Sequence, residues 1–129
     1  MKKTFFFASL IGSLIFTACS KSENDNSTGI KTIKYDFTTT NAGNFSIQAK
    51  VDTVEYSEVA NTLTWTKTIS VTGSDSAVLT VFPPTDWVSI NNEADVNLKI
   101  SVNGVEKVAE TAHFIGLDRP NGLRIATGY

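Results

Sequence analysis

The stretch VNLKISVNGVEKVAET, residues 96–111, contains two runs of alternating apolar and polar residues on either side of Asn103-Gly104. Alternation with a period of two is typical of a β-strand that has one buried face. Asn-Gly is the strongest short-range signal for a type I′ turn, because both central residues of that turn need positive φ angles. The stretch therefore predicts an antiparallel hairpin of residues 96–102 and 105–111.

The same alternation recurs along the chain in short segments that are separated by turn-forming residues. Pro83 and Pro84 should end one of these strands, because proline has no N–H to donate to a neighbouring strand. Two segments flank the turn DRPNG and are expected to pair with each other, 112–117 and 122–126. The remaining segments are 33–37, 45–51, 63–71 and 77–81.

Seven or eight short strands without a helix indicate an all-β protein, and we expect an immunoglobulin-like antiparallel β-sandwich of about seven strands rather than a barrel. Each large apolar side chain in its core should contribute roughly 1.5–3 kcal/mol by burial. The expected core residues are Ile33, Tyr35, Phe45, Ile47, Leu63, Trp65, Ile69, Leu79, Leu98 and Ile100.

The first 18 residues differ from the rest of the chain. Lys2 and Lys3 precede an apolar run over residues 5–18. As a helix this run would span about 21 Å, less than the roughly 30 Å hydrocarbon core of a bilayer. The pattern predicts a secretory signal peptide, residues 1–18, with a permanent single-span anchor as the alternative.

Phe16, Thr17 and Ala18 lead directly into Cys19, the only cysteine of the chain. This junction resembles the lipobox of bacterial lipoproteins, with phenylalanine in place of the usual leucine. The resemblance implies that the Cys19 thiol carries a diacylglycerol, that residues 1–18 are removed, and that the new amino group is commonly acylated. Two or more acyl chains anchor a protein stably, whereas one gives only marginal attachment. An ordinary thiol in a spacer is the alternative.

Residues 20–29, SKSENDNSTG, contain no apolar side chain and therefore predict a flexible tether. The chain then divides into a signal peptide (1–18), a lipidated tether (19–29) and a β-sandwich domain (30–129). The acidic residues after Cys19 resemble the export signal of Bacteroides-type lipoproteins, which implies an outer-membrane protein at the cell surface. If these acids only keep the tether soluble, the domain faces the periplasm.

The charge and the rare residue types exclude several classes of function. Removal of residues 1–18 takes away two of the 11 basic residues and none of the 13 acidic ones, which changes the formal net charge from −2 to −4. Because no segment concentrates basic residues, nucleic acid is not an expected partner. His113 is the only histidine and no nucleophile elbow accompanies it, so it is expected to be a structural or surface residue. We expect no metal, no cofactor and no catalytic residue.

Trp87 follows Asp86 between two predicted strands, and Glu93 and Asp95 come soon after it. Carboxylates beside an aromatic ring are typical of a glycosidase or of a sugar-binding platform. The alternative is that Trp87 packs over the end of the sandwich above a solvated loop. The candidate ligand-binding residues are Trp87, Asp86 and Tyr56.

Two tripeptides, Asp52-Thr53-Val54 and Asp75-Ser76-Ala77, resemble O-glycosylation sites of exported proteins from the same bacterial group. The resemblance implies modification of Thr53 and Ser76 and would place both residues on the surface. Chance occurrence of such short motifs is the alternative.

The stretches KYDFTTT (34–40), TWTKTISV (64–71) and LKISVNGVEKVAE (98–110) together resemble the extracytoplasmic domain of the MmpS family of transport accessory proteins. The resemblance spans most of residues 31–112 and implies a small β-sandwich and partnership with an RND-type exporter. That family has a membrane-spanning amino terminus and a cysteine pair in the domain, whereas this chain has only Cys19.

These observations favour a non-enzymatic, lipid-anchored cell-envelope protein whose loop ends bind a protein or a glycan. The second expectation is an accessory subunit of an RND-type membrane transporter. An enzyme is the third and weakest, because no motif in the chain announces a reaction.

Overall fold

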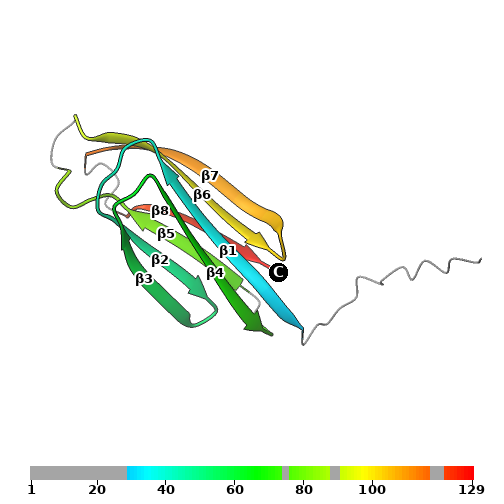
Figure 1. Ribbon diagram of the computed structural model, residues 1–129. Helices are drawn as coiled ribbons and strands as arrows, with labels where there is room; N and C mark the ends of the chain where they lie inside the picture. The colour runs from blue at the N-terminus through cyan, green and yellow to red at the C-terminus, as the bar shows by residue number, and fades with distance from the viewer. Residues whose placement is uncertain (1–28, 74–75, 88–90, 117–120) are drawn as a thin grey trace, which may run out of the picture.

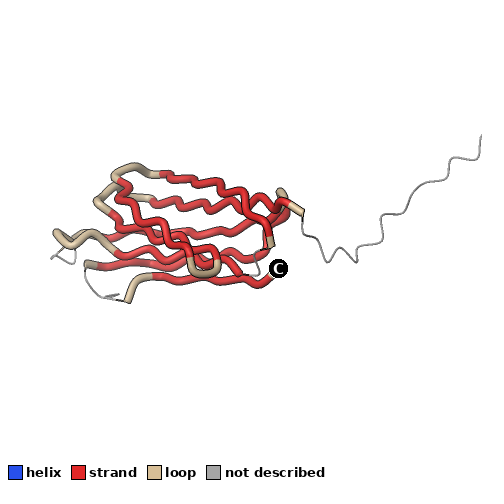
Figure 2. Tube along the Cα trace, turned by 90° about the horizontal axis from the view of Figure 1, so that it is seen from below, coloured by secondary structure: helices blue, strands red, loops and turns tan. Residues whose placement is uncertain are grey.

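The computed structural model describes residues 29–73, 76–87, 91–116 and 121–129, and these residues form eight β-strands and no helix. Two antiparallel sheets of four strands, in the orders β4-β1-β6-β7 and β3-β2-β5-β8, lie face to face (Figures 1 and 2). The predicted β-sandwich is confirmed, with eight strands rather than about seven. The strands are β1 (Ile30–Thr39), β2 (Phe45–Val51), β3 (Val54–Ala60), β4 (Thr64–Thr72), β5 (Ser76–Phe82), β6 (Glu93–Val102), β7 (Val105–Ile115) and β8 (Leu123–Gly128).

The hairpin predicted around Asn103-Gly104 is present as β6 and β7. Asn103 and Gly104 have φ angles of 51° and 79°, as a type I′ turn requires. The predicted pairing of 112–117 with 122–126 is wrong. Residues 112–115 continue β7 along the full length of β6, and β8 pairs with β5 in the other sheet.

The strand β3 was not predicted from the sequence. It pairs with β2 through a two-residue turn in which Asp52 has a φ angle of 49°, and Val51 lies opposite Val54. As an edge strand it is mostly exposed on both faces, and only Ala60 is buried. A strand without a buried face has no reason to alternate, so its sequence lacks the period-two signal.

The core fills the space between the sheets and includes every predicted core residue except Leu63 and Trp65. Leu63 is 52% exposed because it lies in the turn before β4, and Trp65 is half-buried because β4 is an edge strand. The prediction for Leu63 was wrong, whereas Trp65 packs against the core as a partly buried residue. Aromatic rings missing from the predicted list, including Phe37 and Phe114, complete the core.

None of the described residues forms a helix long and apolar enough to cross a membrane. The predicted signal peptide, Cys19 and residues 20–28 of the predicted tether lie outside the described residues.

Candidate functional site

The strand directions give the sandwich two distinct ends, which we call the tether end and the far end. The tether end holds Ile30, where β1 begins, the turns at 52–53 and 103–104, and the carboxyl-terminal Tyr129. The far end holds the connections at 40–44 and 83–87, the start of β6 and the end of β7. In Figure 1 the carboxyl terminus and the start of β1 lie at one end of the sandwich, and the start of β6 lies at the other. The predicted site residues are divided between these two ends.

Trp87 lies at the far end and belongs to the core. Its side chain is 5% exposed, and its ring packs edge-on against Phe45 with centroids 5.2 Å apart. A Cβ atom added at Gly43 would come within 3.0 Å of the indole nitrogen, so only glycine lets this backbone approach so closely. Trp87 therefore packs over the end of the sandwich, which is the alternative given for it from the sequence. Asp86 beside it is exposed in a turn.

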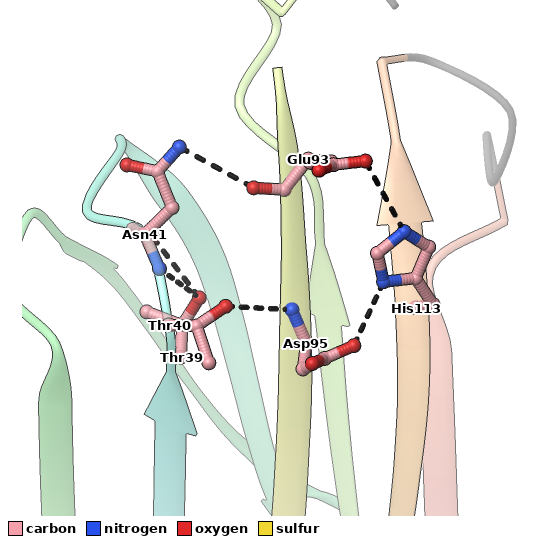
Figure 3. A network of polar contacts seen from close by, with 6 residues as sticks. All are labelled: Thr39, Thr40, Asn41, Glu93, Asp95 and His113. Atoms are coloured by element: carbon pink, nitrogen blue, oxygen red, sulfur yellow. Dashed lines mark hydrogen bonds and ion pairs between the residues drawn. The ribbon is translucent and has the colours of Figure 1, made fainter. Parts of the chain in front are cut away.

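A polar network joins three strands at the far end (Figure 3). On β6, Glu93 and Asp95 project from the outer face toward His113 on β7; Asp95 Oδ1 lies 2.7 Å from His113 Nδ1, and Glu93 Oε2 lies 3.5 Å from His113 Nε2. The amide N–H of Asp95 donates to Thr40 Oγ1 at 2.9 Å, and Asn41 Nδ2 donates to the Glu93 carbonyl at 3.3 Å. The result is an exposed cluster of two carboxylates and one imidazole on a rigid strand pair.

The charge on His113 is set by this cluster. The hydrogen bond to Asp95 is the main cause that raises the pKa of His113, and the negative charges of Asp95 and Glu93 add to it. An imidazolium between two carboxylates leaves the cluster with a net charge of about −1, whereas a neutral imidazole leaves about −2.

Tyr56, the third predicted ligand residue, lies elsewhere, on the open edge between β3 and β4. It is half-buried, and Lys67 Nζ lies 5.1 Å from the centre of its ring. Lys67 also forms an ion pair with Glu58, and Trp65 Nε1 donates to the other Glu58 oxygen at 2.9 Å. The hydrogen bonds from Lys67 and then Trp65 lower the pKa of Glu58. This cluster joins the edge strands of the two sheets, which indicates a structural role for Tyr56.

The two predicted glycosylation positions lie together at the tether end. Thr53 is exposed in the turn between β2 and β3. Ser76 is half-buried at the start of β5, where its amide N–H and hydroxyl both donate to Asp52 Oδ1, at 3.1 and 3.3 Å. Asp52 of the first motif thus holds the serine of the second, and Thr53 has the more accessible hydroxyl.

A shallow groove of about 340 Å³ on the outer face of the β3-β2-β5-β8 sheet was not predicted. Its floor is β5, whose outward side chains are short: Ser76, Val78 and Thr80. Longer side chains form its walls, with Gln48 and Lys50 on β2 and Arg124 on β8. The signal in the sequence is the run of small outward residues at 76, 78 and 80, and it becomes readable only when the strand order is known.

In the part of the chain that the structure describes, no group of three or more His, Cys, Asp or Glu side chains is arranged to hold a metal ion. No known protein family model matches the chain, and no curated protein matches it significantly. The functional argument therefore depends on the residues themselves.

Proposed function

We propose that this chain is a lipid-anchored outer-membrane protein, displayed at the cell surface, whose β-sandwich binds a protein or glycan partner and catalyses no reaction. The observation that supports this function best is the separation of the two ends of the sandwich. The predicted anchor enters at the tether end, through Ile30, while the far end carries exposed polar side chains.

The tether length fits this arrangement. From Ser20 to Gly29 the chain has ten residues, which extend to at most about 36 Å when fully stretched. A lipid on Cys19 would keep the domain close to the bilayer and leave the far end free to meet partners. The absence of apolar residues from the tether agrees with a flexible linker.

The far end has the properties of a recognition surface. Carboxylates, amides and hydroxyls from the 40–44 connection and from β6 and β7 are exposed together, at Asn41, Glu93 and Asp95. In the core near the same end, the rings of Phe45 and Trp87 pack edge-on against each other. Binding residues are frequently found on connections that a rigid scaffold holds in place.

The anchor is tested by mass spectrometry of the protein purified from membranes. We expect a mature chain that begins at a lipid-modified Cys19, and we expect Cys19→Ser to move the protein out of the membrane fraction. A mature chain that retains residues 1–18 would contradict lipid anchoring. Protease treatment of intact cells distinguishes surface display, in which the domain is cleaved or shed, from the periplasmic orientation.

The binding role is tested by placing a photo-crosslinking amino acid at Thr85, which is exposed at the far end, and at Thr72, which is exposed at the tether end. We expect a partner adduct from position 85 in living cells and none from position 72. An adduct with an RND-type exporter would support the transport accessory role instead. Equal labelling from both positions would contradict recognition by the far end.

A further inference from the structure

A second binding site is indicated by the groove over β5. We propose that it binds a carboxylate-bearing sugar, such as a uronic acid unit of an acidic glycan, through Arg124. This inference is independent of the far-end network, because the groove lies on the outer face of the other sheet.

The shape of the groove follows from side-chain length and strand register. Thr80 lies opposite Gln48 on one side and Arg124 on the other, and Val78 lies opposite Lys50. Lys50 and Arg124 thus stand on strands two positions apart, about 10 Å across the sheet, with the short side chains of β5 between them. Long walls above a low floor create a groove whose volume is in the range of small-molecule sites.

The charge at the Arg124 end of the groove favours an anionic ligand. Within the described residues, neither Lys50 nor Arg124 takes part in an ion pair. Two carboxylates, Asp52 and Glu55, also line the groove and equal the two cations in number. Both lie toward the turn at 52–53, where Glu55 is directly opposite Lys50 and Asp52 accepts from Ser76. Arg124 lies opposite Thr80, which is uncharged, and is therefore the cation available to a ligand.

The neutral groups suit a sugar rather than a bare anion. Gln48, Thr80 and Arg124 lie in one row across the three strands, and the Thr80 hydroxyl and the Gln48 amide can donate to and accept from ring hydroxyls. The guanidinium of Arg124 matches a carboxylate with two parallel hydrogen bonds, which lysine cannot reproduce.

Isothermal titration calorimetry on the full chain purified in detergent tests the proposal, with trigalacturonic acid, its methyl ester and inorganic phosphate as probes. We expect the acid to bind, and the ester and phosphate to bind at least about tenfold more weakly. Arg124→Gln should weaken binding of the acid about tenfold or more, the loss expected for a charge-assisted hydrogen bond. The control Lys107→Gln removes an exposed cation from β7, outside the groove, and should leave binding unchanged.

Each alternative outcome overturns the proposal. Equal binding of the ester would remove the role of the carboxylate, and equal binding of phosphate would reduce the groove to a general anion site. Absence of binding, or equal weakening by Lys107→Gln, would exclude the groove as a specific site. Thr80→Val keeps the shape of the side chain and should weaken binding of the acid while binding of phosphate is unchanged. None of these results affects crosslinking from Thr85, so failure of this site and failure of the far-end function are distinguishable.

Discussion

The phenolic hydroxyl of Tyr35 on β1 donates a hydrogen bond to the backbone carbonyl of Lys50 on β2, 2.8 Å away. The side chain of Tyr35 is fully buried, so this bond crosses the core and joins the two sheets. Burial, followed by the nearby Tyr129, Tyr56 and Asp52, raises the pKa of Tyr35 above its ordinary value, so the neutral donor is the form that the folded protein holds. The bond also fixes the backbone of Lys50 beneath the groove.

Replacing Tyr35 by phenylalanine removes this bond and keeps the ring. We expect Tyr35→Phe to lower the free energy of unfolding by about 1 kcal/mol, the net value of a typical internal hydrogen bond. Urea denaturation followed by circular dichroism measures the change. Tyr56→Phe is the matched control and should have a smaller effect, because the hydroxyl of the half-buried Tyr56 donates no hydrogen bond to any of the described residues. Equal effects would contradict a special role for the Tyr35 bond.

Lys67 lies opposite Tyr35, on the inward-facing side of the edge strand β4, and its ion pair with Glu58 reaches across to β3. A charge that points inward at an edge discourages pairing with another sheet edge. We expect Lys67→Met to promote self-association, which sedimentation velocity at increasing protein concentration would detect. Thr68→Met places the same side chain on the outer face of β4 and should leave the association state of the wild type unchanged. Identical behaviour of both variants would exclude edge protection by Lys67.

Gly43 lies against Trp87 and Pro84, and an added methyl group would meet the Pro84 ring at 2.6 Å. We therefore expect Gly43→Ala to lower the free energy of unfolding by about 1–3 kcal/mol, as overpacking usually does. The displaced indole should also become more accessible to acrylamide, as measured by tryptophan fluorescence quenching. Ala42→Ser is an exposed control at the neighbouring position and should behave as wild type. An unchanged free energy of unfolding in Gly43→Ala would show that the loop can rearrange around the added methyl group, and would contradict this prediction.

His113 gives an unambiguous NMR signal because it is the only histidine. We expect its pKa to lie above the ordinary 6.5 and to fall in Asp95→Asn, since Asp95 is the main cause of the increase. Glu93→Gln should lower it less, because Glu93 is 3.5 Å away rather than 2.7 Å. Because the folded pKa is raised, the stabilisation by this pair is present below pH 6.5 and is lost as the pH rises through the folded pKa. A titration midpoint that does not respond to Asp95→Asn would contradict the pairing.

The sequence was informative where one face of a strand is buried and the other is exposed. The alternation in β1, β2, β5 and β6 is strong because each of these strands has neighbours on both sides and packs on the core. It fails for β3 and misleads for Leu63, because the place of an edge strand or a turn in the fold, and not its composition, decides how exposed it is. Which sheet each strand joins was also not readable, because alternation does not identify a partner.

The far-end network could not have been predicted from the hairpin alone. If β6 and β7 paired regularly from Asn103-Gly104, Asp95 would lie opposite Ala112. An irregularity at Ile100/Ser101 shifts the register by one residue and brings Asp95 opposite His113 instead. A shift of one residue exchanges the two faces of a strand, so a single local feature decides whether His113 meets the carboxylates. No residue pattern in the sequence marks this shift.

The place of β1 in its sheet has a kinetic consequence. Ile33 pairs with Ile69 of β4 on one side and with Val102 of β6 on the other. The first strand of the sheet in chain order, β1, therefore gains its second neighbour only after β6 has been synthesised. Contacts between segments that are far apart in the sequence form slowly, and sandwiches dominated by such contacts fold in roughly milliseconds to seconds. The nascent domain should therefore remain open until β6 has been delivered, and cooperative folding should begin only when nearly the whole sandwich is available.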